Sequence, residues 1–144
     1  MNPKLTKGFY GLGNSYISQK DYSNAIDALN KALILDPDDA STYLSMGNAY
    51  YNNGNSSGSI PFYKRAAELD PKWETPIWYL GDAYLNTKQY TLAADAYEKV
   101  LGINPKNASA IYGLGLVYIS RNDFALARQQ KIKLDVLDPA QAAK

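Results

Sequence analysis

The chain contains neither cysteine nor histidine among its 144 residues. Without them it lacks the Ser-His-Asp and Cys-His arrangements of nucleophilic catalysis, the commonest zinc ligands and any disulfide framework. A glycine-rich phosphate loop is also missing, because Gly11 and Gly13 are not followed by Gly-Lys-Ser or Gly-Lys-Thr. We therefore expect no enzyme activity, no catalytic residue, no metal site and no cofactor.

Charge of one sign and long apolar runs are scarce too. The chain has 15 basic and 14 acidic residues, with a net charge of +1 and no long run of either sign. Nucleic-acid binding needs a basic stripe and membrane-surface binding a polybasic patch, so we expect neither partner. No apolar stretch is long enough to span a bilayer, and residues 1–5 lack the apolar stretch of a secretory signal. A cytoplasmic location is the resulting expectation.

What the chain does have is a repeat. Pro37, Pro71, Pro105 and Pro139 each follow the one before by 34 residues (71 − 37, 105 − 71 and 139 − 105). A fixed period of this length is the sequence signature of a repeat architecture. Three further columns keep the same period. The glycine column is Gly13, Gly47, Gly81 and Gly115, and the tyrosine column is Tyr16, Tyr50, Tyr84 and Tyr118. The column of small residues is Ala25, Ser59, Ala93 and Ala127.

Each unit is predicted to contain two helices. Phe9, Leu12 and Tyr16 are spaced three and four apart, which places them on one helical face. Glycine inside a helix costs about 1 kcal/mol relative to alanine, so four glycines in register indicate a close approach of the second helix backbone. Each proline ends the second helix, because proline cannot continue a helix and disfavours helical geometry in the residue before it.

These columns resemble the tetratricopeptide repeat family. Its signature of an aromatic residue, Leu-Gly, Tyr, Ala and Pro is matched in the first unit by Phe9, Leu12-Gly13, Tyr16, Ala25 and Pro37. We place the repeats at 6–39, 40–73, 74–107 and 108–141, within one domain that covers 1–144. The resemblance implies an all-α solenoid, in which four antiparallel helix-turn-helix repeats stack into a right-handed superhelix with a concave inner face.

The second unit departs from the pattern between Gly54 and Pro61, where the other units have an aromatic residue and a helix start. Proline is well tolerated only in the first turn of a helix. The second helix of this unit is therefore predicted to begin late, near Ser59 as its N-cap. The segment is then either a longer surface turn or a hinge or loop that touches a partner.

In this family the first helix of each pair lines the concave face. Large apolar side chains occupy one equivalent position there in all four units, and a row that is mostly amide and carboxylate lies one turn further on. Such a face suits an extended or helical peptide, because the rings supply buried area and the amides pair with the peptide backbone. The alternative is that the rings only pack on neighbouring helices. The predicted peptide-binding residues are Tyr10, Asn14, Leu44, Asn48, Tyr51, Trp78, Tyr79, Asp82, Tyr112 and Leu116.

One branch of the family grips the C-terminal carboxylate of a partner with lysine, asparagine and arginine side chains. The matching positions here hold Tyr10, Asn14, Ser45, Thr75 and Tyr79, and only Asn14 agrees. Because these positions carry no positive charge, the ligand is predicted to be neutral or mostly apolar. The resemblance then indicates an adaptor that holds a peptide segment of another protein.

The two ends of the array differ from its middle. Lys131 and Asp135 stand where earlier units have apolar residues, which predicts a solvated cap on the fourth unit. At the other end, Phe9 and Leu12 form an unshielded apolar flank that missing sequence, a second copy or a partner could cover. The alternative function is therefore a self-assembling structural scaffold, a homo-oligomer formed through this exposed end.

Overall fold

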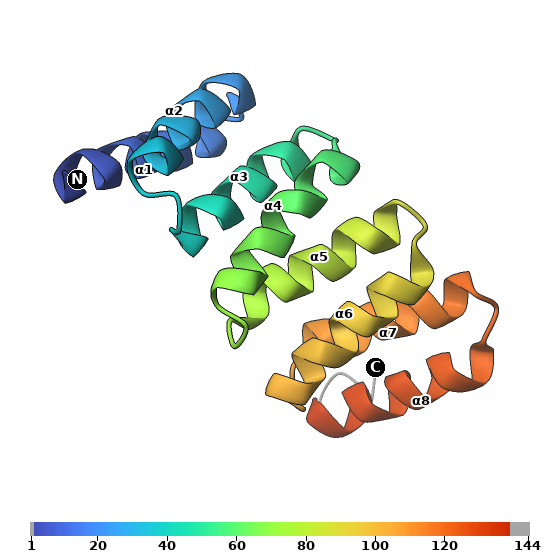
Figure 1. The fold of residues 1–144 in the computed structure, drawn as a ribbon. Helices are drawn as coiled ribbons and strands as arrows, with labels where there is room; N and C mark the ends of the chain where they lie inside the picture. The colour runs from blue at the N-terminus through green and yellow to red at the C-terminus, as the bar shows by residue number, and fades with distance from the viewer. Residues whose placement is uncertain (1, 139–144) are drawn as a thin grey trace. The chain divides into compact units, whose positions relative to one another are not determined.

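The computed structural model describes residues 2–138, and these residues form eight helices and no strand (Figure 1). The all-α prediction and the helix-turn-helix repeats are confirmed. Residues 139–141, which end the predicted fourth repeat, lie outside the described residues. The helices are α1 (Pro3–Ser18), α2 (Tyr22–Leu35), α3 (Ala40–Asn52), α4 (Ser56–Leu69), α5 (Glu74–Asn86), α6 (Tyr90–Ile103), α7 (Ala108–Ser120) and α8 (Phe124–Leu137).

The chain divides into two compact units, residues 1–76 and 77–144. In the first unit α1 packs on α2, α3 packs on α4, and α3 also packs on α2 and α1. In the second unit α7 packs on both α6 and α8. The prediction of a single superhelical domain concerns how the two units join, and it stays a prediction.

Short polar side chains start most of the helices. Each accepts a hydrogen bond from a backbone N–H in the first turn, which satisfies a donor that the helix itself leaves unpaired. The second helix of each pair ends at a residue with extended geometry that precedes the proline column, as steric conflict with proline requires. The capping residues are Asn2, Asp21, Asp39, Asn55, Asn107 and Asp123.

The turn inside each repeat uses one left-handed residue at an equivalent position. These residues are Lys20, Gly54, Lys88 and Asn122, with φ angles of 61°, 82°, 61° and 60°. Left-handed geometry is routine for glycine and accessible to asparagine, but it crowds the Cβ of lysine. The repeat therefore imposes one backbone shape on four different local sequences.

The glycine column lies beneath side chains of the second helix. A Cβ added to Gly13 would lie 2.6 Å from Cγ of Leu29, one added to Gly47 would lie 2.5 Å from Cδ1 of Tyr63, and one added to Gly81 would lie 2.7 Å from Cε1 of Tyr97. The predicted close approach is therefore present in the first three repeats. The sequence predicts that the backbone of the second helix makes this close approach. That prediction was wrong, because a leucine or tyrosine side chain of the second helix occupies the space above the glycine.

The prediction of a late start for α4 was also wrong. The helix begins at Ser56, and the Asn55 side chain caps it by accepting a hydrogen bond from the Gly58 N–H at 2.8 Å. This cap favours the early start strongly enough that Pro61 lies inside the helix. The ring of Pro61 is exposed, so it meets no neighbouring helix. The turn before α4 spans residues 53–55, which matches the length of the turn at 19–21 in the first repeat.

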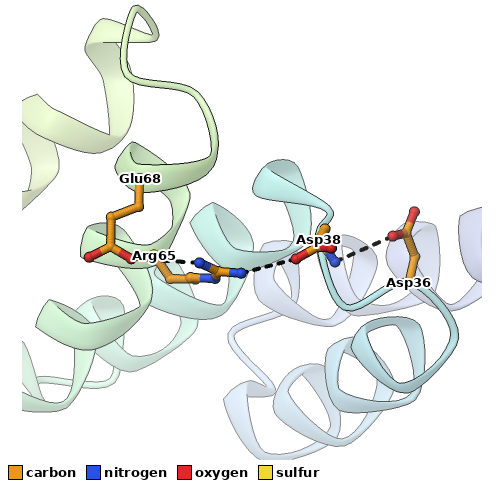
Figure 2. Close-up of polar contacts among 4 residues, drawn as sticks. All are labelled: Asp36, Asp38, Arg65 and Glu68. Carbon is orange, nitrogen blue, oxygen red and sulfur yellow. Dashed lines mark hydrogen bonds and ion pairs between the residues drawn. The ribbon is translucent and has the colours of Figure 1, made fainter.

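An ion pair holds the turn between α2 and α3 against α4 (Figure 2). Nη2 of Arg65 lies 3.0 Å from Oδ1 of Asp38, and Nη1 of Arg65 lies 3.7 Å from Oε2 of Glu68. The backbone N–H of Asp38 donates to Oδ1 of Asp36 at 3.4 Å. These carboxylates therefore have structural partners in the turn. The side chains are substantially exposed, and ion pairs of this kind contribute about 1 kcal/mol or less.

Candidate functional site

The first unit carries five of the predicted peptide-binding residues on α1 and α3. All five are half-buried, so each packs on the fold and still presents part of its surface to solvent: Tyr10, Asn14, Leu44, Asn48 and Tyr51. Tyr10 also lines a pocket of about 250 Å³, together with Lys7, Ser41 and the two turn carboxylates Asp36 and Asp39. In that pocket the single lysine faces two carboxylates, which leaves it without net positive charge.

Asn48 is already engaged within the fold. The buried Tyr63 on α4 donates its hydroxyl hydrogen to Oδ1 of Asn48 at 2.9 Å. The ring of Tyr51 lies 6.4 Å from that of Tyr63, with the two planes tilted by 58°. The amide oxygen of Asn48 therefore serves the repeat, and its amide nitrogen remains as the donor for a ligand. Sequence reasoning had assigned Asn48 to the ligand alone.

Trp78 and Tyr79 on α5 form an aromatic pair in the second unit. Their ring centroids are 4.9 Å apart at an interplanar angle of 69°, which is an edge-to-face arrangement. The indole N–H of Trp78 is buried and has no hydrogen-bond partner among residues 2–138. The packing alternative describes part of this pair, because each ring packs on the other, and each ring is still only half-buried. The ligand contact of the two rings stays a prediction.

Asp82 repeats the arrangement of Asn48. Asp82 lies 34 residues after Asn48, at the equivalent position of the next repeat. The hydroxyl of the buried Tyr97 on α6 donates a hydrogen bond to Oδ1 of Asp82. Burial raises the pKa of the Asp82 carboxyl from its ordinary value, and the hydrogen bond from Tyr97 offsets part of that increase. Asp82 is therefore a hydrogen-bond acceptor within the fold, and its burial disfavours the charged form of its carboxyl group.

Tyr112 and Leu116 on α7 line a pocket between α7 and α8. The pocket has a volume of about 230 Å³, and its lining includes Gly115, Gln130 and Lys131. Tyr112 is 58% exposed, whereas Gln130 is buried and its Oε1 has no hydrogen-bond partner in the described part of the chain. The two predicted residues thus meet at a real depression, and Gly115 and Gln130 were missed.

The predicted solvated cap on the fourth repeat has a different character in the structure. Nζ of Lys131 lies 2.8 Å from Oδ2 of Asp135 one turn along α8, so the two charges pair with each other. With Lys131 drawn aside, Gly115 meets nothing closer than Cβ of Gln130, at 3.7 Å from an added Cβ. The lysine in place of a leucine or tyrosine was the sequence signal for this pocket.

Between residues 2 and 138, no three or more His, Cys, Asp or Glu residues form a group that could hold a metal ion. No helix in that range combines the length and apolar character needed to cross a membrane.

Two models of repeat families match the sequence. A model described as TPR repeat matches residues 13–54 and 81–120, and a model described as Tetratricopeptide repeat matches residues 40–72. The chain belongs to the tetratricopeptide repeat (TPR) family. Most of the columns that repeat along this TPR chain are structural, since they form the glycine contacts, the left-handed turns and the proline-marked helix ends described above.

Several solved structures of other proteins are similar to this one. A crystal structure of MamA protein has 28% identity and a TM-score of 0.89, over 96% of this chain and 75% of that one. YrrB, described as a TPR protein with an unusual peptide-binding site, has 22% identity and a TM-score of 0.85, over 93% of this chain and 69% of that one. The first TPR of Spaghetti (RPAP3), bound to the HSP90 peptide SRMEEVD, has 21% identity and a TM-score of 0.80, over 85% of this chain and 97% of that one. No curated protein matches the chain.

Proposed function

We propose that this TPR chain is a protein-interaction adaptor that binds a neutral or mostly apolar peptide segment of a partner along the first helices of its repeats. The observation that carries the proposal is that the equivalent large apolar side chains on the first helices are accessible in each of the two units. Tyr10, Leu44 and Trp78 are half-buried and Tyr112 is exposed. Packing positions on the same helices, such as Met46, are fully buried. Rings held in this way supply contact area at low entropic cost.

A polar group beside these side chains suits a peptide backbone. The amide nitrogen of Asn48 donates to a peptide carbonyl, while its oxygen stays held by Tyr63. A backbone presents such carbonyl groups at regular intervals whatever its side chains are, so this donor selects for an ordered peptide and not for one sequence.

The charge of the ligand follows from what the first helices lack. The positions that would clamp a carboxylate hold Tyr10, Thr75 and Tyr79, and the one lysine in the Tyr10 pocket faces Asp36 and Asp39. An acidic tail such as SRMEEVD, the peptide bound to the RPAP3 domain, therefore finds no excess positive charge here. That domain and YrrB share only the fold with this chain, and they support peptide binding as a use of that fold.

The test is selection from a random displayed peptide library, followed by fluorescence polarisation with the selected peptides. We expect enrichment of neutral, apolar-rich peptides, and loss of their binding in a Tyr10→Ala, Trp78→Ala double variant. The matched control is Ile34→Ala, because Ile34 is 79% exposed and lies on α2, outside the proposed face. Circular dichroism checks that the double variant is folded. Undiminished binding by a folded double variant contradicts the proposal.

We propose self-assembly as a second function, because one specific observation favours it. Leu5 and Leu12 on α1 are among the exposed large apolar side chains, whereas Met46 and Leu114, at the positions equivalent to Leu12 in the second and fourth repeats, are buried. Apolar surface of this kind marks an interaction site when it is contiguous. Light scattering over a concentration series tests this function, and a constant monomer mass contradicts it.

A further inference from the structure

One kind of helix packing occurs inside both units, and α1 carries the same face without a partner. In that packing the first helix of a repeat lies on the second helix of the repeat before it, as α3 lies on α2 and α7 on α6. On these packed helices Met46 on α3 and Leu114 on α7 occupy equivalent positions, and they are 0% and 2% exposed. The equivalent residue on α1 is Leu12, which is 44% exposed.

No described residue fills the opposite half of that packing on α7 and α8. In the second and third repeats, Tyr63 and Tyr97 fill the space above the glycine column. The residue 34 positions after Tyr97 is Lys131, which turns to Asp135 instead. The result is the pocket of about 230 Å³ above Gly115, in the place where a further first helix would lie.

We propose that the occupant of this α7–α8 pocket is helix α1 of a second copy of the chain, joined head to tail. This inference rests on the self-assembly function proposed above and names the surface that receives α1. Leu12 becomes the residue buried at the new contact, as Met46 and Leu114 are at the contacts inside each unit. The occupant is argued from continuity, because the contact reproduces one that the chain already makes internally.

The shape of α1 suits this contact. Gly8 and Gly11 have no atom within 4 Å of an added Cβ, so the α1 backbone can approach a neighbour closely at both positions. Gly11 is equivalent to Gly113 on α7, and an added Cβ at Gly113 would overlap the ring of Tyr97. Glycine at this position of a first helix is therefore already used inside the second unit to admit a bulky side chain.

The polar groups are also compatible. Oε1 of Gln130 is a buried acceptor at the pocket without a partner among the described residues, and it needs a donor. Helix α1 has two lysines, Lys4 and Lys7, and no carboxylate. It therefore brings no like charge against Asp135. Lys131 is neutralised by its ion pair and opposes α1 only weakly.

A head-to-tail contact is heterologous, so each added copy leaves the same two faces open and the assembly grows as a chain or closes as a ring. An isologous dimer, in which α1 packs on α1 of the second copy, leaves the α7–α8 pocket unused. A foreign peptide in the pocket leaves this chain monomeric. The three occupants therefore differ in what happens when each face is blocked separately.

Two single variants block the two faces. Leu12→Asp places a charge at the centre of the α1 face. Gly115→Leu fills the α7–α8 pocket, and its Cβ makes only an ordinary contact of 3.7 Å with Cβ of Gln130. Leucine is also a better helix former than glycine, so this variant is expected to fold at least as well as the parent. Ile34→Asp, at a side chain 79% exposed on α2, is the matched control.

The experiment is sedimentation velocity of the full chain over a concentration series, with circular dichroism of each variant. We expect oligomers of the parent and of Ile34→Asp to grow with concentration, and each blocked variant alone to remain a monomer. An equimolar mixture of the two blocked variants should give a dimer and nothing larger, because only one competent pair of faces remains.

Several outcomes would overturn the proposal. If Gly115→Leu assembles like the parent while Leu12→Asp does not, α1 has another partner surface and self-assembly itself stands. If the mixture of blocked variants stays monomeric, the two faces do not bind each other. If the parent is a monomer at every concentration, the self-assembly function fails together with this contact.

Discussion

The hydroxyl of Tyr63 on α4 donates a hydrogen bond to Oδ1 of Asn48 on α3, at 2.9 Å. The same relationship occurs one repeat later, where the hydroxyl of Tyr97 donates to Oδ1 of Asp82. Two residues that we assign to ligand contact thus also tie together the helix pair that presents them. Substitutions at Asn48 or Asp82 would therefore disturb the fold as well as the proposed ligand contact, and the tyrosines offer a way to separate the two effects.

Tyr63→Phe is expected to lower the free energy of unfolding by about 1 kcal/mol, because Oδ1 of Asn48 loses its donor while the ring still covers Gly47. Urea denaturation measures the difference. Tyr112→Phe is the control, and the 58% exposure of that side chain predicts a change within about 0.5 kcal/mol. Equal effects of the two substitutions would show that the hydrogen bond contributes nothing.

Two positions of one glycine column should respond in opposite directions to alanine. In Gly47→Ala the new Cβ lies 2.5 Å from the Tyr63 ring, and overpacking of this kind costs about 1–3 kcal/mol. In Gly115→Ala the nearest atom is 3.7 Å away, so the gain in helix propensity dominates and raises stability by up to about 1 kcal/mol. Thermal unfolding of both variants provides the comparison, and destabilisation by Gly115→Ala would contradict the open pocket.

Asp82 should make stability depend on pH. The pKa of Asp82 is raised in the folded state, so the folded chain binds more protons than the unfolded chain. The contribution of Asp82 to the free energy of unfolding therefore falls as the pH rises above 3.8, which is the ordinary pKa of this carboxyl. In Asp82→Asn this loss is absent, and Asn48 shows that an amide accepts the same tyrosine hydrogen bond. The stability advantage of the variant should therefore increase as the pH rises above 3.8.

Urea denaturation at several pH values measures this advantage directly. The matched control is Asp95→Asn, since Asp95 is an exposed carboxylate on the neighbouring helix α6. A difference between Asp82→Asn and the parent that stays constant over the same range would rule out a raised pKa at Asp82.

Pro61→Ala is expected to stabilise the chain by about 1–3 kcal/mol. Proline at the sixth residue of α4 removes a backbone hydrogen bond to the carbonyl of Ser57 and crowds that carbonyl, and alanine relieves both effects. Denaturant unfolding checks the gain. Pro37→Ala is the comparison, because Pro37 lies in a turn where no helical hydrogen bond is missing, and it should give no such gain.

Lys88→Gly is expected to stabilise the chain by roughly 1 kcal/mol, because the φ of 61° crowds the lysine Cβ and suits glycine. Asn122→Gly, at a φ of 60°, should gain less since asparagine tolerates this geometry. Differential scanning calorimetry ranks the two. A larger gain at Asn122 would mean that backbone strain does not set the order.

The repeat itself was predictable because each of its columns reports a rigid local requirement. Proline excludes helix continuation whatever surrounds it, and a helical glycine implies a close neighbour. Pro37 and Gly47 therefore gave the helix boundaries and the packed face from the sequence alone. Local rules sufficed there because each column involves only one turn or one helix pair.

Predictions failed where two local preferences compete or where side chains from separate helices meet. The cap at Asn55 and the proline at Pro61 favour different starts for α4, and the sequence does not show that the cap prevails. Tyr63 and Asn48 are 15 residues apart, and only the crossing of α3 and α4 brings them together. Lys131 was visible as an exception, but its pairing with Asp135 and the pocket left behind depend on rotamers.

The ring of Tyr97 lies over two glycines, Gly81 of its own repeat and Gly113 of the next. The second repeat has Ser45 at the position of Gly113, so a chimera that places a copy of repeat two after repeat three would drive a serine Cβ into this ring. The repeats are thus not interchangeable modules, even though they share one period. Anyone who shuffles, deletes or duplicates them must carry each junction residue together with the bulky residue that precedes it.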